Sequence, residues 1–179
     1  MEDLSLHLLD IAENSIDAGA DRIEMRIEED SVKDLLLLEV RDNGRGMDEE
    51  TMVKVTDPFY TTKTVRRVGL GLPFLSQAAE ECGGKFSITS ERGRGTTISA
   101  SFTRSHIDRK PLGDIAATMV VLVTGHPDID FVLEYKRDGF CYRFDTAEIK
   151  HELGEIPIST PVVLEIIKKD INRGMSKKI

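Results

Sequence analysis

The most informative stretch of this chain is Asp42-Asn43-Gly44-Arg45-Gly46. It follows the apolar block 35–40, so we expect it to stand where a buried strand ends. Its two glycines permit positive φ and the close approach of a ligand, because glycine has no Cβ. The aspartate would then present one acceptor beside bare backbone. Calcium-binding loops also mix acid and glycine, so the meaning of this run depends on the segments around it.

The composition is that of an ordinary soluble globule of 179 residues, with 40% hydrophobic and 31% charged residues. A net charge of −8 and a pI near 5.1 argue against a nucleic-acid binder. The sequence carries no signal-peptide pattern and no apolar run of membrane length, so we expect a cytoplasmic protein without membrane association. Cys82 and Cys141 lack metal-type spacing. We expect both thiols to be reduced and buried; a disulfide between them is the alternative.

A helix is predicted over residues 3–18, because apolar residues recur there at helical spacing. They are Leu4, Leu8, Ile11, Ala12 and Ile16. A polar stripe occupies the opposite side. It consists of His7, Asp10, Asn14 and Asp17. One interpretation of the stripe is a solvated face. The other is a defined functional surface, since Gly19 ends the helix cleanly.

Further along, the pattern predicts several strands and one short helix. The strands are 22–28, 35–40, 85–90 and 96–102, and the short helix is 48–55. Residues 56–68 have no usable period, and their hydroxyls and cations suit a lid over an anionic ligand. The run Gly69-Leu70-Gly71-Leu72 opens a helix that continues to Glu81. Its free amides suit a phosphate, although a purely structural helix start is the alternative.

The order of these segments resembles that of the Bergerat-fold ATPases. This superfamily includes gyrase, the ninety-kilodalton heat-shock chaperone, mismatch-repair ATPases and the catalytic domains of histidine kinases. The motifs that carry the resemblance are the helix with Asn14, the D-x-G-x-G run at 42–46, P-F-x-T-T-K at 58–63, G-L-G-L at 69–72 and G-x-G-T-T at 93–97. The resemblance covers residues 4 to about 103. It implies an α+β fold, a sandwich whose mixed, largely antiparallel sheet carries helices on one face.

The resemblance implies ATP and Mg²⁺ as ligands. Asn14 would coordinate the metal, and Asp42 would accept the exocyclic amine of adenine. Gly44 and Gly46 would let the backbone flank the base. Thr96 would support Asp42 and the base through water.

On the phosphate side, the resemblance implies that the amides of Gly69, Leu70 and Gly71 lie against the phosphates. Lys63 would reach the γ-phosphate from the lid. Hydrolysing members have a glutamate four residues before the asparagine as general base, and this chain has Asp10 there. An aspartate is one methylene shorter, so we expect slow turnover with Asp10 as the base. Glu13 is the alternative carboxylate, but its angle on the helix directs it away from Asn14.

We expect two units, 1–104 as a histidine-kinase-like ATP-binding domain and 105–179 as a small C-terminal α/β extension for partner docking. The extension pattern predicts a hairpin over 131–145 and helices over 147–153 and 161–173. Residues 115–123 favour a helix by their Gly-then-Pro stop, whereas their valines favour a strand.

Three functions remain open at this point. The first is a Mg-dependent ATP-binding protein with a closing lid, a slow ATPase or ATP-driven switch acting on a partner protein. The second is a protein kinase acting in trans, of the anti-sigma serine kinase or histidine kinase type. The third is a nucleotide sensor that does not hydrolyse ATP. The regulatory partner is not identified by the sequence, and a homodimer is left open.

Overall fold

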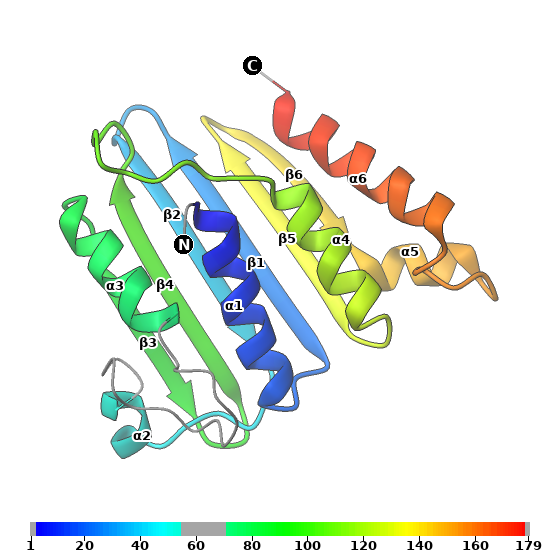
Figure 1. Cartoon of the computed structure of the whole chain (residues 1–179), viewed down its shortest axis with the longest axis horizontal. Helices are drawn as coiled ribbons and strands as arrows, with labels where there is room; N and C mark the ends of the chain where they lie inside the picture. The colour runs from blue at the N-terminus through cyan, green and yellow to red at the C-terminus, as the bar shows by residue number, and fades with distance from the viewer. Residues whose placement is uncertain (1–2, 55–70, 178–179) are drawn as a thin grey trace.

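A single six-stranded sheet, in the order β3-β4-β2-β1-β5-β6, organises the chain (Figure 1). The computed structural model describes residues 3–54 and 71–177. The strands are β1 (Arg22–Asp30), β2 (Leu35–Asp42), β3 (Phe86–Glu91), β4 (Gly95–Thr103), β5 (Asp130–Arg137) and β6 (Phe140–Asp145). Every neighbouring pair is antiparallel except β1 and β5, which run parallel.

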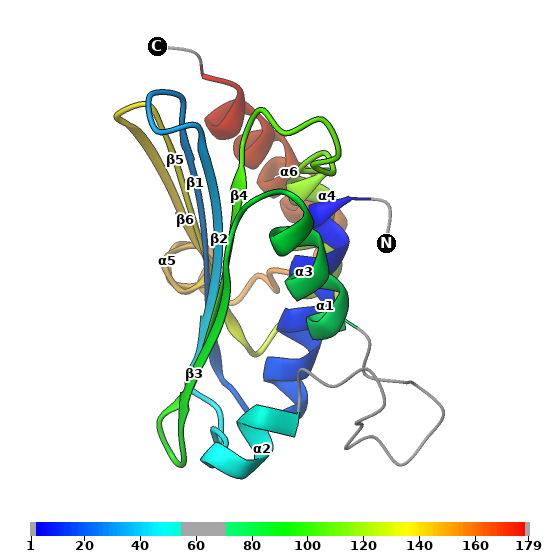
Figure 2. The same cartoon turned by 90° about the vertical axis from the view of Figure 1, so that its left-hand side faces the viewer.

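Helices cover one face of this sheet, as the edge-on view in Figure 2 shows. They are α1 (Leu4–Asp17), α3 (Gly71–Glu81), α4 (Ile115–Gly125) and α6 (Pro161–Ser176). Helix α4 packs between α1 and α6, and α1 also contacts α3. The short helix α2 (Glu49–Lys54) contacts β3, and the short helix α5 (Thr146–Leu153) contacts β5. The predicted α+β fold, with a mixed, largely antiparallel sheet and helices on one face, is confirmed.

The hydrophobic pattern of the central strands explains why only one face is covered. In β1, Ile23, Met25 and Ile27 are buried, and the charged residues between them are more exposed. Leu36, Leu38 and Val40 repeat this pattern on β2. Successive side chains of a strand point to opposite faces, so these residues form the floor on which the helices pack. None of the helices in the described ranges combines the length and apolar character of a membrane span.

The C-terminal half extends the same sheet. Strand β5 pairs in parallel with β1, and β6 returns beside it after a turn at Asp138 and Gly139, whose φ values are 46° and 88°. This hairpin agrees with the predicted one. Residues 115–125 form a helix, because its buried positions follow helical spacing: Ile115, Ala116, Thr118, Met119, Leu122 and Val123. Whether 1–104 and 105–179 act as separate units stays a prediction.

The expectation of two buried thiols is half wrong. Both cysteines are free, and Cys82 is buried, but Cys141 is exposed. Cys141 lies on β6, which is an edge strand of the sheet. It alternates there with Phe140 and Tyr142, which are partly buried against the helix-covered core. Cys141 therefore falls on the uncovered face.

Candidate functional site

Asp42 ends β2 with its carboxylate buried and held from three directions; the residue is 7% exposed. Its Oδ2 accepts a hydrogen bond from the Ser15 hydroxyl at 2.8 Å. Its Oδ1 accepts the backbone N–H groups of Gly44 at 2.9 Å and Thr96 at 3.2 Å. An ionised carboxylate has about four lone-pair positions. Counting donors from the described residues, one acceptor position is left on Oδ2, enough for one N–H donor of a ligand.

The glycines next to Asp42 are required by close packing. A Cβ at Gly44 would lie 3.0 Å from the Ala18 carbonyl oxygen. Gly46 has φ of +64°, and its Cβ would lie 2.0 Å from the carbonyl oxygen of Glu91. Gly95 has φ of +99°, and its Cβ would lie 2.0 Å from the carbonyl oxygen of Asp42. A side chain at Gly46 or Gly95 would collide with strand backbone beside Asp42, and one at Gly44 would press on Ala18 at the end of α1. The role of Gly44 and Gly46 beside a base stays a prediction.

Thr96 supports Asp42 directly through its backbone amide, whereas the resemblance implied support through water. Its hydroxyl lies 2.9 Å from the hydroxyl of Ser90. Ser90 in turn accepts the Met47 amide at 2.8 Å and donates to the Gly95 carbonyl at 3.0 Å. This network ties the segment after Asp42 to the β3–β4 turn. The carboxylate is therefore held in place by groups of the protein itself.

A second cluster joins α1 to the start of α3. The Asn14 side-chain amide donates to Asp10 Oδ2 at 3.4 Å. A Cβ at Gly71 would lie only 1.7 Å from the same Asp10 oxygen. The structure thus brings Gly71, which was proposed from the glycine-rich helix start, to the Asp10/Asn14 pair of α1. Because the amide nitrogen of Asn14 donates to Asp10, its side-chain carbonyl oxygen is the atom left to accept or to coordinate. The role of Asn14 as a metal ligand stays a prediction.

Glu13 lies outside this cluster. Its carboxylate is 3.4 Å from the Nε2 of His126, which follows the end of α4. The helical angle that directed Glu13 away from Asn14 is consistent with this contact. Asp10 is therefore the carboxylate of α1 that lies beside both Asn14 and Gly71.

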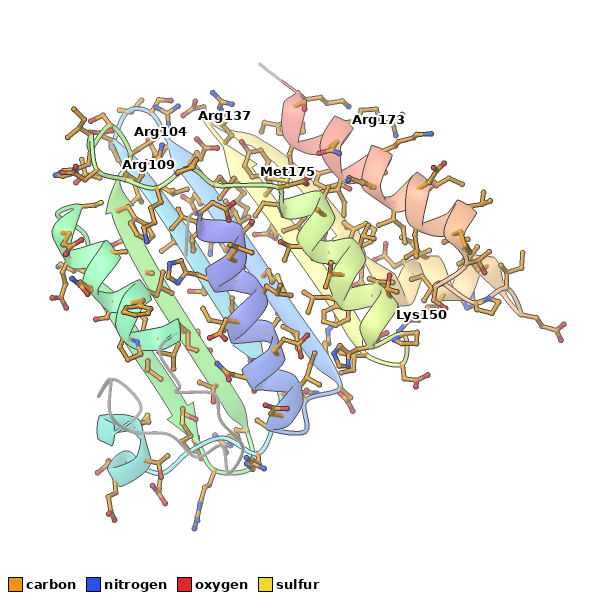
Figure 3. The ribbon with its side chains drawn as sticks, viewed as in Figure 1. Arg104, Arg109, Arg137, Lys150, Arg173 and Met175 are labelled. Atoms are coloured by element: carbon orange, nitrogen blue, oxygen red, sulfur yellow. The ribbon has the colours of Figure 1, made fainter. Side chains whose placement is uncertain are left out.

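Three predicted site residues, Lys63, Gly69 and Leu70, lie outside the described residues, as does the expected lid. Several other cations lie far from Asp42. Figure 3 shows Arg104, Arg109 and Arg137 at the end of the sheet opposite α2. Arg104 pairs there with Glu29 at 3.2 Å, and Arg109 donates to the Arg104 carbonyl at 2.7 Å. These arginines serve the fold at that end.

Two supporting residues escaped the sequence reasoning. Ser15 is 3% exposed and lies on the apolar side of α1, four residues after Ile11. A lone hydroxyl within an apolar stripe needs a buried partner, and this signal could have pointed to Asp42. Ser90 gave no such signal, because β3 alternates between partly buried and exposed residues.

A family model described as "Histidine kinase-, DNA gyrase B-, and HSP90-like ATPase" matches residues 2–106. This match covers more than half of the chain, so the chain belongs to that family, and the suspected superfamily is confirmed. It carries the ATP-binding type of domain that the family shares.

Among curated relatives, the chain is 39% identical over 66 residues to sporulation kinase E of Bacillus subtilis (strain 168). That match covers 37% of this chain and 9% of the kinase. It is 33% identical over 81 residues to sensor kinase CckA of Brucella abortus (strain 2308), covering 45% of this chain and 9% of that protein. The chain therefore spans only a small part of the length of these relatives.

A solved structure, the N-terminal domain of a DNA repair protein, is similar in fold. Its TM-score is 0.54 at 17% identity, covering 80% of this chain and 52% of that one. At this identity the likeness concerns the fold alone. It extends past residue 106, the end of the family match, because 80% of the chain is included.

Proposed function

We propose that this chain binds Mg-ATP between α1, β2 and α3, and that it acts as a slow ATPase or ATP-driven switch on a partner protein. The observation that carries the proposal is the carboxylate of Asp42, fixed by Ser15, Gly44 and Thr96 with one acceptor position left. An adenine amine can fill that position, whereas guanine would present a carbonyl oxygen to the carboxylate. The site would therefore select adenine over guanine.

Asn14 would hold the magnesium ion through its carbonyl oxygen. Within residues 3–54 and 71–177, no group of three or more His, Cys, Asp or Glu residues is arranged to hold a metal ion. A single carboxamide suits Mg²⁺, which keeps several waters and binds substrate phosphates. When bound, the ion would neutralise charge on the phosphate oxygens.

Asp10 would act as the general base. Its Oδ2 lies beside Asn14 and at the first residue of α3, where free amides favour anionic groups. A water placed between Asp10 and the phosphates could give its proton to this carboxylate. Gly71 is required for this arrangement, because any side chain there would displace Asp10.

The test of binding uses calorimetric titration with Mg-ATP and with Mg-GTP. We expect binding of ATP only, and a loss of at least tenfold in affinity for Asp42→Asn, whose amide would offer the adenine amine a donor. If Asp42→Asn binds ATP as the wild type does, the proposed adenine site is wrong.

The test of hydrolysis uses labelled ATP and two matched variants of α1. Asp10→Asn should abolish phosphate release, and Glu13→Gln should retain it, because Glu13 pairs with His126 instead. The reverse result would assign the base to Glu13. Tight binding without any phosphate release by the wild type would instead indicate a nucleotide sensor.

The kinase names of the relatives favour a second candidate, phosphoryl transfer in trans to a protein. Label that moves from ATP to a co-purified protein would support it over hydrolysis. Docking of that partner on residues 105–179, and a homodimer, are further parts of this proposal. A pull-down with and without ATP, followed by sizing of the complex, tests both.

A further inference from the structure

Asn43, the residue after Asp42, is exposed, yet both polar atoms of its side chain are engaged by the protein. Its Oδ1 accepts the backbone N–H groups of Asp21 and Arg22, each at 3.1 Å. Its Nδ2 donates to Asp21 Oδ1 at 2.6 Å. A side chain that only faced solvent would leave these bonds to water. Asn43 instead directs them to one short segment at the start of β1.

That segment is anchored in the middle of the sheet. The Asp21 carbonyl accepts the backbone N–H of Asp130 at 2.8 Å, and Asp130 is the first residue of β5. The guanidinium of Arg22 donates to the buried carboxylate of Asp145 at 3.1 Å. Strand β1 lies between β2 and β5 in the strand order. The partners of Asn43 are therefore among the firmly held residues at this end of the sheet.

The run 42–46 also contacts the connection between α1 and β1 through its backbone. The Arg45 N–H donates to the carbonyl of Ala18 at 3.0 Å. A Cβ at Gly44 would lie 3.1 Å from the Cβ of Ala18. Figure 1 shows the segment that follows β2 at the same end of the sheet as the end of α1. Asn43 adds side-chain contacts to this docking of the run on residues 18–22.

The direction of the Asp42 carboxylate depends on this docking. Its Oδ2 is held by Ser15, which belongs to α1, and its Oδ1 is held by the amide of Gly44, which belongs to the run itself. Hydrogen bonds of this kind weaken steeply outside a narrow range of distance and angle. The run must therefore keep a fixed place relative to α1 if both bonds are to form. Asn43 ties the run to the segment that follows α1.

We propose that Asn43 is a positioning residue for the adenine site, and that through Asp21 and the start of β1 it aims the Asp42 carboxylate at the 6-amino group of the base. The inference rests on the proposed function, because it concerns the atom that would accept that amine. Asn43 acts through Asp42 and does not touch the base in this scheme. Its loss would reduce recognition of the amine and leave the phosphate end of the site in place.

The experiment exchanges the two partners. Asn43→Asp keeps an acceptor for the two backbone N–H groups but sets a carboxylate against that of Asp21. Adding Asp21→Asn returns a donor to the pair, with the hydrogen bond reversed and the net charge of the wild type. Asp21→Asn alone keeps an acceptor for the Asn43 amide and is the matched control. Asn43→Ala removes the contacts without adding charge, so it provides the test if Asn43→Asp does not fold.

Each protein is titrated by calorimetry with Mg-ATP and with the magnesium complex of purine riboside triphosphate, which lacks the 6-amino group. The wild type should prefer ATP roughly tenfold or more, because the amine donates to a charged acceptor. Asn43→Asp and Asn43→Ala should lose most of this preference. The exchanged pair and Asp21→Asn should retain it.

The ratio of the two affinities separates positioning from a merely structural role. A structural asparagine would lower the unfolding midpoint and leave the ratio unchanged. That result, or an exchanged pair that does not regain the preference, would make the inference wrong while the proposed function stands. A wild type that binds ATP without preference over the analogue would contradict the adenine contact itself, and both proposals would be wrong.

Discussion

Acidification should destabilise this protein through His7, and the size of the effect follows from its pKa. The folded state holds the pKa of His7 at about 4, against an ordinary value of 6.5. Between these values the unfolded chain binds a proton that the folded chain does not, so stability rises with pH across this window and is lost as pH falls. The linkage amounts to about 1.4 kcal/mol at pH 5.5 and about 2.5 kcal/mol at pH 4.5, relative to pH 7.5.

Urea unfolding at these three pH values, on wild type and His7→Leu, isolates this term from the carboxylates that titrate nearby. At pH 7.5 the leucine variant should be at least as stable as wild type, because it removes two buried ring nitrogens that accept or donate no hydrogen bond within residues 3–54 and 71–177. Its advantage should then grow by about 2.5 kcal/mol as pH falls to 4.5. His151→Gln, an exposed position, is the control and should follow the wild type. A constant difference between His7→Leu and wild type across the series would refute a neutral, buried His7.

Three other changes test the packing around the site. Ser15→Ala removes a donor from the buried Asp42, which should cost about 1.5–3 kcal/mol in urea unfolding and weaken ATP binding; an unchanged midpoint would mean that the hydroxyl is dispensable. Gly46→Ala should lower the melting temperature far more than Gly93→Ala, since both have positive φ but only Gly46 would clash with the backbone. Burial alone would raise the pKa of Asp145, but its amide and arginine donors outweigh burial and hold that pKa below 3.8. The ionised Asp145 carboxylate therefore stabilises the fold above pH 3.8, and this stabilisation is lost at lower pH. The unfolding free energies of Asp145→Asn and wild type should consequently converge in acid.

Local patterns were sufficient to predict most elements of this fold. The alternation in β1 and the helical spacing in α1 each describe a burial face that the structure shows. Residues 115–125 were harder, because valines favour strands while the Gly-Pro stop favours a helix. Burial at helical spacing resolves that conflict, and burial depends on α1 and α6, which lie far away in the sequence.

The pairing of β5 with β1 could not be predicted from either strand. About 100 residues separate the two, and their register depends on which surfaces remain uncovered after the rest of the sheet has formed. The exposure of Cys141 depends on long-range packing in the same way, since it follows from which face of β6 the helices cover. Long-range order of this kind is set by the packing of whole elements.

The predicted polar stripe of α1 combined two different environments. Angular position groups His7, Asp10 and Asn14 on one side of the helix, but it cannot say what covers that side. In the structure, Gly71 at the start of α3 lies against Asp10 and beside His7, so the stripe is in part an interface between two helices. This is why the alternatives of a solvated face and a functional surface could not be resolved from the sequence.

Helix α1 also connects the two halves of the proposed site. Asp10 lies beside the first turn of α3, and Ser15, little more than one turn later, holds the carboxylate of Asp42. A helix rises 1.5 Å per residue, so these two contacts are about 7.5 Å apart along one rigid rod. A shift of α1 along its axis would therefore disturb both ends of the proposed site: the adenine end at Asp42 and the phosphate end at Asp10.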